Sequence, residues 1–365
     1  MPGAKRPSLR SVMAKRHRGP YGVPPGNQPK ASPPRVVASL LGAMKDGKEY
    51  ESLLSVAVQP GLDLVVELRR ALKEIEDLRQ RPCICYIANV MRDAPEIAIS
   101  PADHLPFNEL VGCIDASVSE VDLLLVTPGG QAHQVTQFVS ALRPRFDVVD
   151  FLLPYSCMSA GTLWVCSGDA IWMDSRAQIG PIDPQIPTRD GRLVPAQSLL
   201  VLLDFIRRQG EQAMASGGPI PFHLMVLLNS MDKKEVAHAI GASNYCIGLA
   251  SDYLEKHKFR RWQVHSSTGA QVTPEERRAR AEDVAAQLCS HERWKAHGHA
   301  ITRGVAWSEL RIKIENLESV AGLDRAVRRF WALAHWVFDN TDAVKFFLSQ
   351  DFSLVRNVPR QVVKG

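Results

Sequence analysis

A serine and a glycine pair occupy positions where a nucleophile and its oxyanion-binding groups could meet. Gly129 and Gly130 follow a short apolar run, residues 121–126, and Ser159 lies about thirty residues further on, where a second apolar run gives way to small residues. A serine at the start of a helix lies near unpaired backbone N–H groups, which favour developing negative charge. This layout is typical of acyl transfer through a serine, although a serine that only caps a helix produces the same local pattern.

The glycine pair suits this chemistry because of its backbone. Glycine tolerates positive φ and has no Cβ, so Gly129 and Gly130 at the carboxyl end of a strand could direct N–H groups into the space above a sheet. A carbonyl oxygen that becomes an oxyanion could bind there. The alternative is an ordinary strand-to-helix turn, because residues 131–142 have the apolar spacing of a helix.

A third segment, residues 175–185, is expected to form the wall of a cleft. Gly180 permits close approach, and Pro181 and Pro184 fix the backbone of the turn that follows the apolar run 170–173. We therefore predict that Gly180 and Pro181, together with the glycine pair, contact the substrate.

Together these three segments resemble the serine dehydrogenase proteinase family. This family belongs to the clan that contains signal peptide peptidase A, the Clp protease proteolytic subunit and the crotonases. The matching motifs are Thr-Pro-Gly-Gly at 127–130, Met-Ser-Ala-Gly-Thr at 158–162 and Gly-Pro-Ile-Asp-Pro-Gln at 180–185. The close resemblance covers roughly residues 84–200, with weaker similarity at 294–301 and near the C-terminus.

The resemblance implies both a fold and a set of roles. Ser159 matches the nucleophile, and the backbone N–H groups of Gly130 and Ala160 match the oxyanion hole. The expected fold is a ClpP/crotonase-like α/β spiral of β-β-α units with helical additions at both ends. Ring or trimer assemblies are also implied.

The general base does not follow from the resemblance. The Clp protease has a histidine on the strand and turn after the nucleophile helix, but the comparable place here, near residues 179–180, has none. Signal peptide peptidase A and its relatives use a lysine forty or more residues after the serine. This chain has no lysine between Lys73 and Lys233, so a serine–lysine pair would require Lys233, Lys234 or a later lysine.

His297 is our preferred base, and Lys233 is the alternative. His297 lies in a segment that resembles the family, and an imidazole is suited to proton transfer near neutral pH. A lysine would instead require burial to lower its pKa. A loop histidine hydrogen-bonded to the backbone is the competing interpretation. Asp183 could orient a base, but we expect it to hold its turn together.

Composition excludes several other classes. His291, His297 and His299 lack the cysteine pair or His-Glu-x-x-His helix of a zinc site, and phosphate-loop and dinucleotide fingerprints are absent, so we predict no metal and no cofactor. The seven scattered cysteines indicate a reducing compartment. No apolar run approaches the about eighteen residues of a membrane span, and the basic N-terminus lacks the apolar stretch of a secretory signal. We predict a cytoplasmic protein.

Charge and element pattern divide the chain into four parts. The formal net charge is +5, and residues 1–45 contain nine Lys or Arg and no Asp or Glu. Nucleic-acid binding is disfavoured because Tyr21 is the one aromatic residue in this stretch. The parts are a disordered basic leader at 1–35, a helical region at 36–80, the ClpP/crotonase-like core at 81–310 and a C-terminal helical region at 311–365.

The core strands and their helices must position the site residues. We predict strands at 83–89, 121–126, 148–154 and 170–173, and helices at 36–58, 62–79, 131–142, 196–212, 221–228, 233–257, 274–290 and 319–348. The last helix is rich in Trp and Phe, which predicts a subunit contact or docking onto the core.

The sequence therefore predicts a cytoplasmic serine peptidase that forms an acyl-enzyme through Ser159. It would act on a peptide or protein as a homo-oligomer, and an unidentified protein partner could feed the site. Two alternatives remain. A crotonase-type acyl-CoA enzyme would use the same fold and oxyanion pocket without a nucleophile, and a non-catalytic oligomeric interaction protein would need no base.

Overall fold

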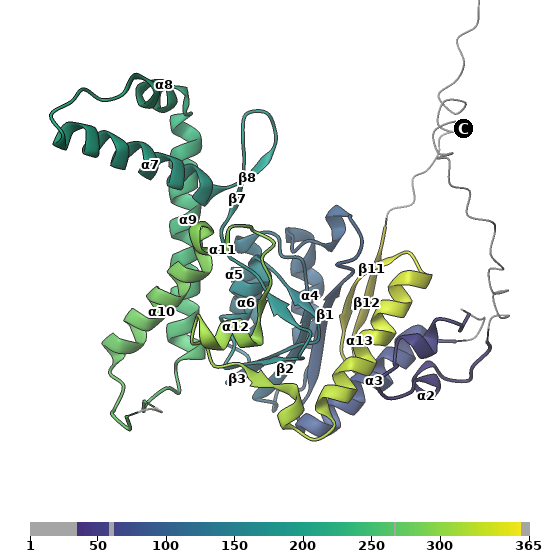
Figure 1. Cartoon of the computed structure of the whole chain (residues 1–365). Coiled ribbons are helices and arrows are strands. Elements are labelled where there is room, and N and C mark those ends of the chain that lie inside the picture. The colour runs from purple at the N-terminus through teal and green to yellow at the C-terminus, as the bar shows by residue number, and fades with distance from the viewer. Residues whose placement is uncertain (1–34, 58–61, 266–267, 359–365) are drawn as a thin grey trace, which may run out of the picture.

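A seven-stranded mixed sheet forms the centre of the molecule. The computed structural model describes residues 35–57, 62–265 and 268–358 (Figure 1). The strand order is β10-β5-β3-β2-β1-β11-β12. The strands are β1 (Cys83–Ala88), β2 (Glu120–Val126), β3 (Val148–Leu153), β5 (Ala170–Met173), β10 (Glu315–Asn316), β11 (Ala343–Leu348) and β12 (Ser353–Asn357). The predicted α/β class is confirmed, and the four predicted core strands lie side by side in parallel.

The central strands are apolar on both faces because helices cover both faces. Alternate residues of β1 point to opposite sides: Ile84 and Tyr86 enter one hydrophobic cluster, and Cys83, Cys85 and Ile87 enter the other. The first cluster includes residues of α4 (His104–Gly112), α5 (Ala132–Leu142), α6 (Ala160–Val165) and α10 (Pro274–Cys289). The second includes residues of α2 (Leu40–Ala43), α3 (Leu64–Arg79) and α13 (Leu323–Asn340).

A small second sheet lies at the carboxyl ends of the central strands. It has the order β4-β6-β9, formed by β4 (Ser156–Cys157), β6 (Gln178–Ile179) and β9 (Ile301–Thr302). The bridge between Thr127 and Cys157 joins it to the end of β2. Two short helices, α11 (His291–Trp294) and α12 (Arg303–Ser308), flank β9 in sequence.

A helical arm projects from the body of the molecule. The hairpin of β7 (Gln185–Pro187) and β8 (Leu193–Pro195) leads into α7 (Ala196–Ala215) and α8 (Phe222–Ser230). The chain returns along α9 (Lys233–Tyr253) and the π-helix η4 (Leu254–Lys258) to α10. Figure 1 shows α7 and α8 at the outer end of α9, away from the sheet. Within the described residues, no helix combines the length and the apolar character needed to cross a membrane.

Two helical predictions were wrong in part. The predicted helix 319–348 contains α13, but residues 343–348 form strand β11, antiparallel to β1. A short apolar run cannot be assigned to helix or strand by periodicity alone, and β11 is buried along its whole length. The segment 36–58 contains only α2 and a single 3-10 turn, Glu51–Leu53, among its described residues. The predicted leader falls almost wholly in residues 1–34, outside the described residues.

The aromatic residues of α13 dock onto the core. Phe330 and Trp336 are buried in the second cluster, and Phe338 stacks on Phe346 of β11 with ring centroids 4.5 Å apart. Of the two predicted uses of this helix, docking is therefore the one that the structure shows.

We expect Trp336→Ala to lower the free energy of unfolding by about 3–5 kcal/mol, because it empties a large volume in a closely packed cluster. Urea unfolding of the purified protein measures this change. Trp307→Ala is the matched control, because Trp307 is 60% exposed whereas Trp336 is 1% exposed. Equal losses for both variants would show that α13 does not stabilise the core.

Candidate active site

Ser159 lies in a strained turn between β4 and α6. Its φ is 52° and its ψ is −117°, a backbone conformation that costs a non-glycine residue on the order of 1–3 kcal/mol. Gly161 N donates to Met158 O at 2.8 Å and Leu163 N donates to Ser159 O at 3.1 Å, which fixes the turn. The side chain of Ser159 is half-buried and makes no capping hydrogen bond, so the helix-cap interpretation is not supported. A serine on a sharp strand-to-helix turn has its hydroxyl free to react.

Gly129 must be glycine because it lies directly against this turn. Its φ is 99°, and a Cβ at this position would lie 2.7 Å from Ser159 Cβ and 2.7 Å from Met158 O. Its N–H donates to Thr127 Oγ1 at 3.1 Å. The absence of a side chain therefore allows the end of β2 to touch the residue that begins α6.

Gly130 is held by the extended residue Ile99. Ile99 N donates to Gly129 O at 2.8 Å, and Gln131 N donates to Ile99 O at 2.9 Å. With φ at 146°, a Cβ on Gly130 would lie 2.3 Å from Ile99 O. Within the described part of the chain, the backbone N–H groups of Gly130 and Ala160 donate to no other group. An oxyanion hole requires backbone donors that are fixed and have no other acceptor.

Gly180 packs on the other side of the same turn. Its N–H donates to Thr162 Oγ1 at 3.0 Å, and Thr162 Oγ1 donates to Cys157 O at 3.1 Å. A Cβ on Gly180 would lie 2.5 Å from Met158 Cε. Gly180 and Pro181 are both buried, so they shape the wall beside Ser159 as a packed segment.

The register of the small sheet brings three polar residues to one edge. Cys157 pairs with Ile179 in parallel, and Ile179 pairs with Ile301 in antiparallel orientation. Ser159 follows its strand by two residues, Asp183 follows β6, and His297 precedes the antiparallel β9. All three residues therefore leave the sheet at the same edge.

His297 and Asp183 form a hydrogen-bonded pair. His297 Nδ1 lies 2.8 Å from Asp183 Oδ1, with Asp183 1% exposed and His297 28% exposed. Ile182 N donates to Leu288 O at 3.0 Å, which joins the Asp183 turn to the end of α10. Trp294 Nε1 donates to Gln287 O at 2.8 Å and fixes the start of the His297 loop. A buried carboxylate on Nδ1 holds an imidazole in the orientation in which Nε2 can accept a proton.

The structure does not connect Lys233 to this site. Lys233 is an exposed residue at the start of α9, without a hydrogen bond or ion pair to Ser159 or Asp183 among the described residues. No hydrogen bond joins Ser159 Oγ to His297 in this part of the chain either, so the role of each as a base remains a prediction. The described residues contain no cluster of three or more His, Cys, Asp or Glu side chains suited to a metal ion.

A buried ion pair behind the glycine loop was not predicted from the sequence. Lys345 Nζ lies 2.8 Å from Asp103 Oδ2 and donates to Ala98 O at 2.9 Å, next to Ile99. Burial lowers the pKa of Lys345, while the Asp103 carboxylate raises it. Tyr86 OH also donates to Asp103 Oδ2. The one available signal was a lysine inside the apolar run 343–348.

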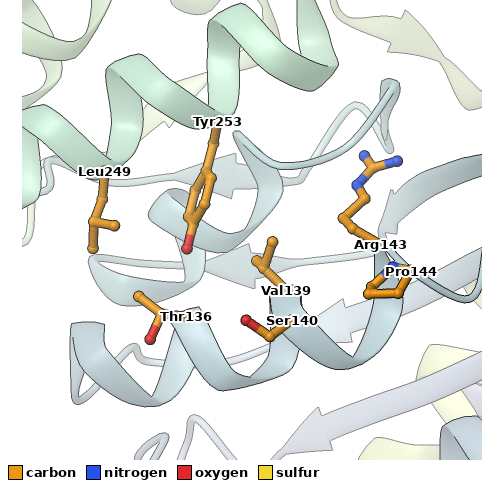
Figure 2. Close-up of a pocket in the computed structure, with 7 residues that line it drawn as sticks. All are labelled: Thr136, Val139, Ser140, Arg143, Pro144, Leu249 and Tyr253. Atoms are coloured by element: carbon orange, nitrogen blue, oxygen red, sulfur yellow. The ribbon is translucent and has the colours of Figure 1, made fainter.

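An open hollow lies elsewhere, between α5 and α9. Its volume is about 520 Å³. Figure 2 shows Thr136, Val139, Ser140, Arg143 and Pro144 of the α5 side facing Leu249 and Tyr253 of α9. None of the predicted site residues lines this hollow.

Comparison with known proteins agrees with the predicted resemblance. Residues 113–213 match the family described as ClpP-like SDH-type serine proteinase, which confirms the predicted family and its ClpP/crotonase-like fold class. Two uncharacterized proteins of Methanocaldococcus jannaschii are similar. MJ0137 is 39% identical over 66 residues, which are 18% of this chain and 23% of that relative. MJ1495 is 36% identical over 92 residues, which are 25% of this chain and 29% of that relative. The chain thus spans about a quarter of the length of these relatives.

A solved structure of the 1510-N membrane-bound stomatin-specific protease, in a serine-to-alanine form, is also similar. The sequence identity is 21%, the TM-score is 0.25, and the match covers 33% of this chain and 60% of that chain.

We expect Gly130→Ala to destabilise the protein by about 2 kcal/mol or more, because φ is positive and the new Cβ would collide with Ile99. Thermal or urea unfolding measures the change. Gly210→Ala is the matched control: this helical glycine of α7 has no atom within 4 Å of an added Cβ, and alanine there should stabilise by about 0.5–1 kcal/mol. A Gly130→Ala variant with an unchanged free energy of unfolding would contradict the close approach of Ile99 to Gly130.

Proposed function

We propose that this protein is a serine peptidase that forms an acyl-enzyme through Ser159; the match of residues 113–213 to the ClpP-like SDH-type serine proteinase family supports this proposal. His297 is the general base, and Asp183 orients it. The observation that carries the proposal is the common sheet edge of Ser159, Asp183 and His297, together with the 2.8 Å contact between His297 Nδ1 and Asp183 Oδ1.

The proposed reaction begins with attack of Ser159 Oγ on the carbonyl carbon of a peptide bond. His297 Nε2 accepts the hydroxyl proton, and the carbonyl oxygen becomes an oxyanion that accepts hydrogen bonds from the N–H groups of Gly130 and Ala160. When the tetrahedral intermediate collapses, the C–N bond breaks and the leaving amine takes the proton from His297. Water, deprotonated by His297, then hydrolyses the ester and restores Ser159.

Several features of the glycine loop support this role. Each donor of an oxyanion hole is worth on the order of 3 kcal/mol of transition-state stabilisation, provided that it is fixed before the reaction. Ile99 forms backbone hydrogen bonds with Gly129 and Gln131 on either side of Gly130, and Lys345, paired with Asp103, donates to Ala98 O in the adjoining segment. We further propose that Gly129, Gly130, Gly180 and Pro181 line the path of the substrate chain.

We also propose a cytoplasmic location. All seven cysteines are free, and six of them are buried. Such usage suits a reducing compartment, where disulfides do not persist.

We propose that the protein is a homo-oligomer and that the arm of α7 and α8 is the contact. Nine large apolar side chains of this arm are exposed, from 37% at Leu227 to 82% at Phe222; the others are Val201, Phe205, Met214, Ile220, Met225, Val226 and Leu228. A helix that is apolar on all sides, as α8 is, is normally covered. The arm has two acidic and two basic residues, all on α7, so two copies could pair without net repulsion.

A fluorophosphonate probe tests the proposed nucleophile and base. We expect the probe to label Ser159, mapped by mass spectrometry, and Ser159→Ala to abolish the adduct. Labelling of His297→Ala should be slower by on the order of 10²–10⁴-fold, the usual contribution of a general base. Lys233→Ala should change the rate less than about twofold, because that lysine is exposed and has no hydrogen bond or ion pair to Asp183 or Ser159 among the described residues.

Ser175→Ala is the control, because Ser175 is an exposed serine outside the proposed site. Loss of labelling in Lys233→Ala, together with a normal labelling rate in His297→Ala, would show that Lys233 and not His297 is the general base. No adduct in folded wild type, combined with measurable coenzyme A binding, would favour the acyl-CoA alternative. No adduct and no such binding would favour a non-catalytic interaction protein.

Sedimentation velocity tests the proposed contact. We expect the wild type to sediment as a multiple of the 40.4 kDa chain. The Phe222→Asp, Met225→Asp double variant should dissociate at protein concentrations about 30-fold higher, or more, than those at which the wild type dissociates. The reason is that loss of interface hot spots costs at least about 2 kcal/mol of association free energy. Leu105→Asp is the matched control, because Leu105 is 65% exposed on α4. A monomeric wild type would refute self-association, and an unchanged double variant would place the contact elsewhere.

A further inference from the structure

One oxygen of the buried Asp183 carboxylate has no hydrogen-bond partner among the described residues. Oδ1 contacts His297, but Oδ2 accepts no hydrogen bond although it is excluded from solvent. A buried carboxylate oxygen left unpaired costs free energy, since it has lost water without replacement. The group that could satisfy Oδ2 should therefore lie nearby.

His291 presents an equally unsatisfied nitrogen to this oxygen. His291 Nδ1 lies 3.9 Å from Asp183 Oδ2, and within the described chain this nitrogen is also buried without a hydrogen bond. At 3.9 Å the two atoms are about 1 Å beyond hydrogen-bond distance. Two buried polar atoms, both unpaired among the described residues, thus lie near each other at a distance slightly too long for a hydrogen bond.

The other polar neighbours of Asp183 do not compete for this oxygen. Burial and the Asp183 charge raise the pKa of the Cys246 thiol to about 11. Burial, then Cys246 and Asp183, raise the pKa of the Cys289 thiol to about 12, and Cys289 already accepts a contact from Gln197 Nε2. No hydrogen bond joins either thiol to Asp183 among the described residues.

We propose that His291 is a positioning residue for the catalytic pair: its Nδ1–H donates to Asp183 Oδ2, so that one carboxylate lies between two imidazoles. This inference rests on the proposed function of His297 as the base. With both oxygens engaged, the Asp183 carboxylate cannot rotate, and His297 keeps the tautomer that carries a proton on Nδ1 and leaves Nε2 free. Hydrogen bonds of this kind are often long in a free enzyme and shorten when the reacting complex forms.

Three variants separate hydrogen bonding from packing. His291→Asn retains an N–H donor close to the position of Nδ1, whereas His291→Leu removes the donor and keeps an apolar side chain. His265→Leu is the control, because His265 lies near Glu276 at the start of α10 and makes no contact with Asp183. The fluorophosphonate labelling rate at Ser159 is the kinetic readout, measured on full-length protein.

We expect labelling to fall about 10-fold or more in His291→Leu, the effect of losing one hydrogen bond to a charged group, and to stay within about threefold of wild type in His291→Asn. His265→Leu should label at the wild-type rate. Equal losses in the Asn and Leu variants would show that His291 acts only by packing, and a normal rate in His291→Leu would overturn the proposal.

Imidazole ¹⁵N chemical shifts provide a readout that does not need activity. We expect His291, identified by the signal lost in His291→Asn, to be the neutral tautomer protonated at Nδ1, and Asp183→Asn to change its shifts. A neutral His291 protonated at Nε2, or shifts indifferent to Asp183→Asn, would contradict the inference even if wild type labels normally. If Ser159 fails to label but the Nδ1–H tautomer is found, the proposed function fails while the contact of His291 with Asp183 stands.

Discussion

The pairing of β4, β6 and β9 is the constraint on which the proposed site depends. Cys157, Ile179 and Ile301 lie side by side across this sheet, so the segments that carry Ser159, Asp183 and His297 emerge together although they are far apart in the sequence. A shift of one residue in either pairing would turn the following side chains to the opposite face. The contact of His297 with Asp183 is then a consequence of register, reinforced by the bond from Ile182 N to Leu288 O.

Close backbone approach is the second requirement, and it explains the small residues. Gly129, Gly161 and Gly180 each lie where an added Cβ would come within 2.7 Å of an atom of the turn or of Thr127. These contacts hold Ser159 at positive φ, so the surrounding chain, rather than Ser159 itself, maintains the strained geometry. These positions therefore favour glycine, because none of them can accept a side chain unless neighbouring atoms move.

Much of this arrangement could be predicted from the sequence, because the signals were local. Apolar runs gave the four parallel strands, and the glycine pair and Ser159 stood at strand ends with small neighbours. Strand β11 was missed, since its apolar run Ala343–Leu348 is too short to distinguish from a helix. The partnership of Asp183 with His297 was not expected, because it joins residues 114 positions apart and only tertiary structure brings them together.

The most direct test of the account is a crystal structure of the protein after reaction with a fluorophosphonate. We predict a phosphorus–oxygen bond to Ser159 Oγ and a phosphoryl oxygen within about 3 Å of the N–H groups of Gly130 and Ala160. His297 Nε2 should lie at hydrogen-bond distance from the adduct, with Asp183 on Nδ1. An adduct on another residue, or a lysine in place of His297 beside Ser159, would contradict it.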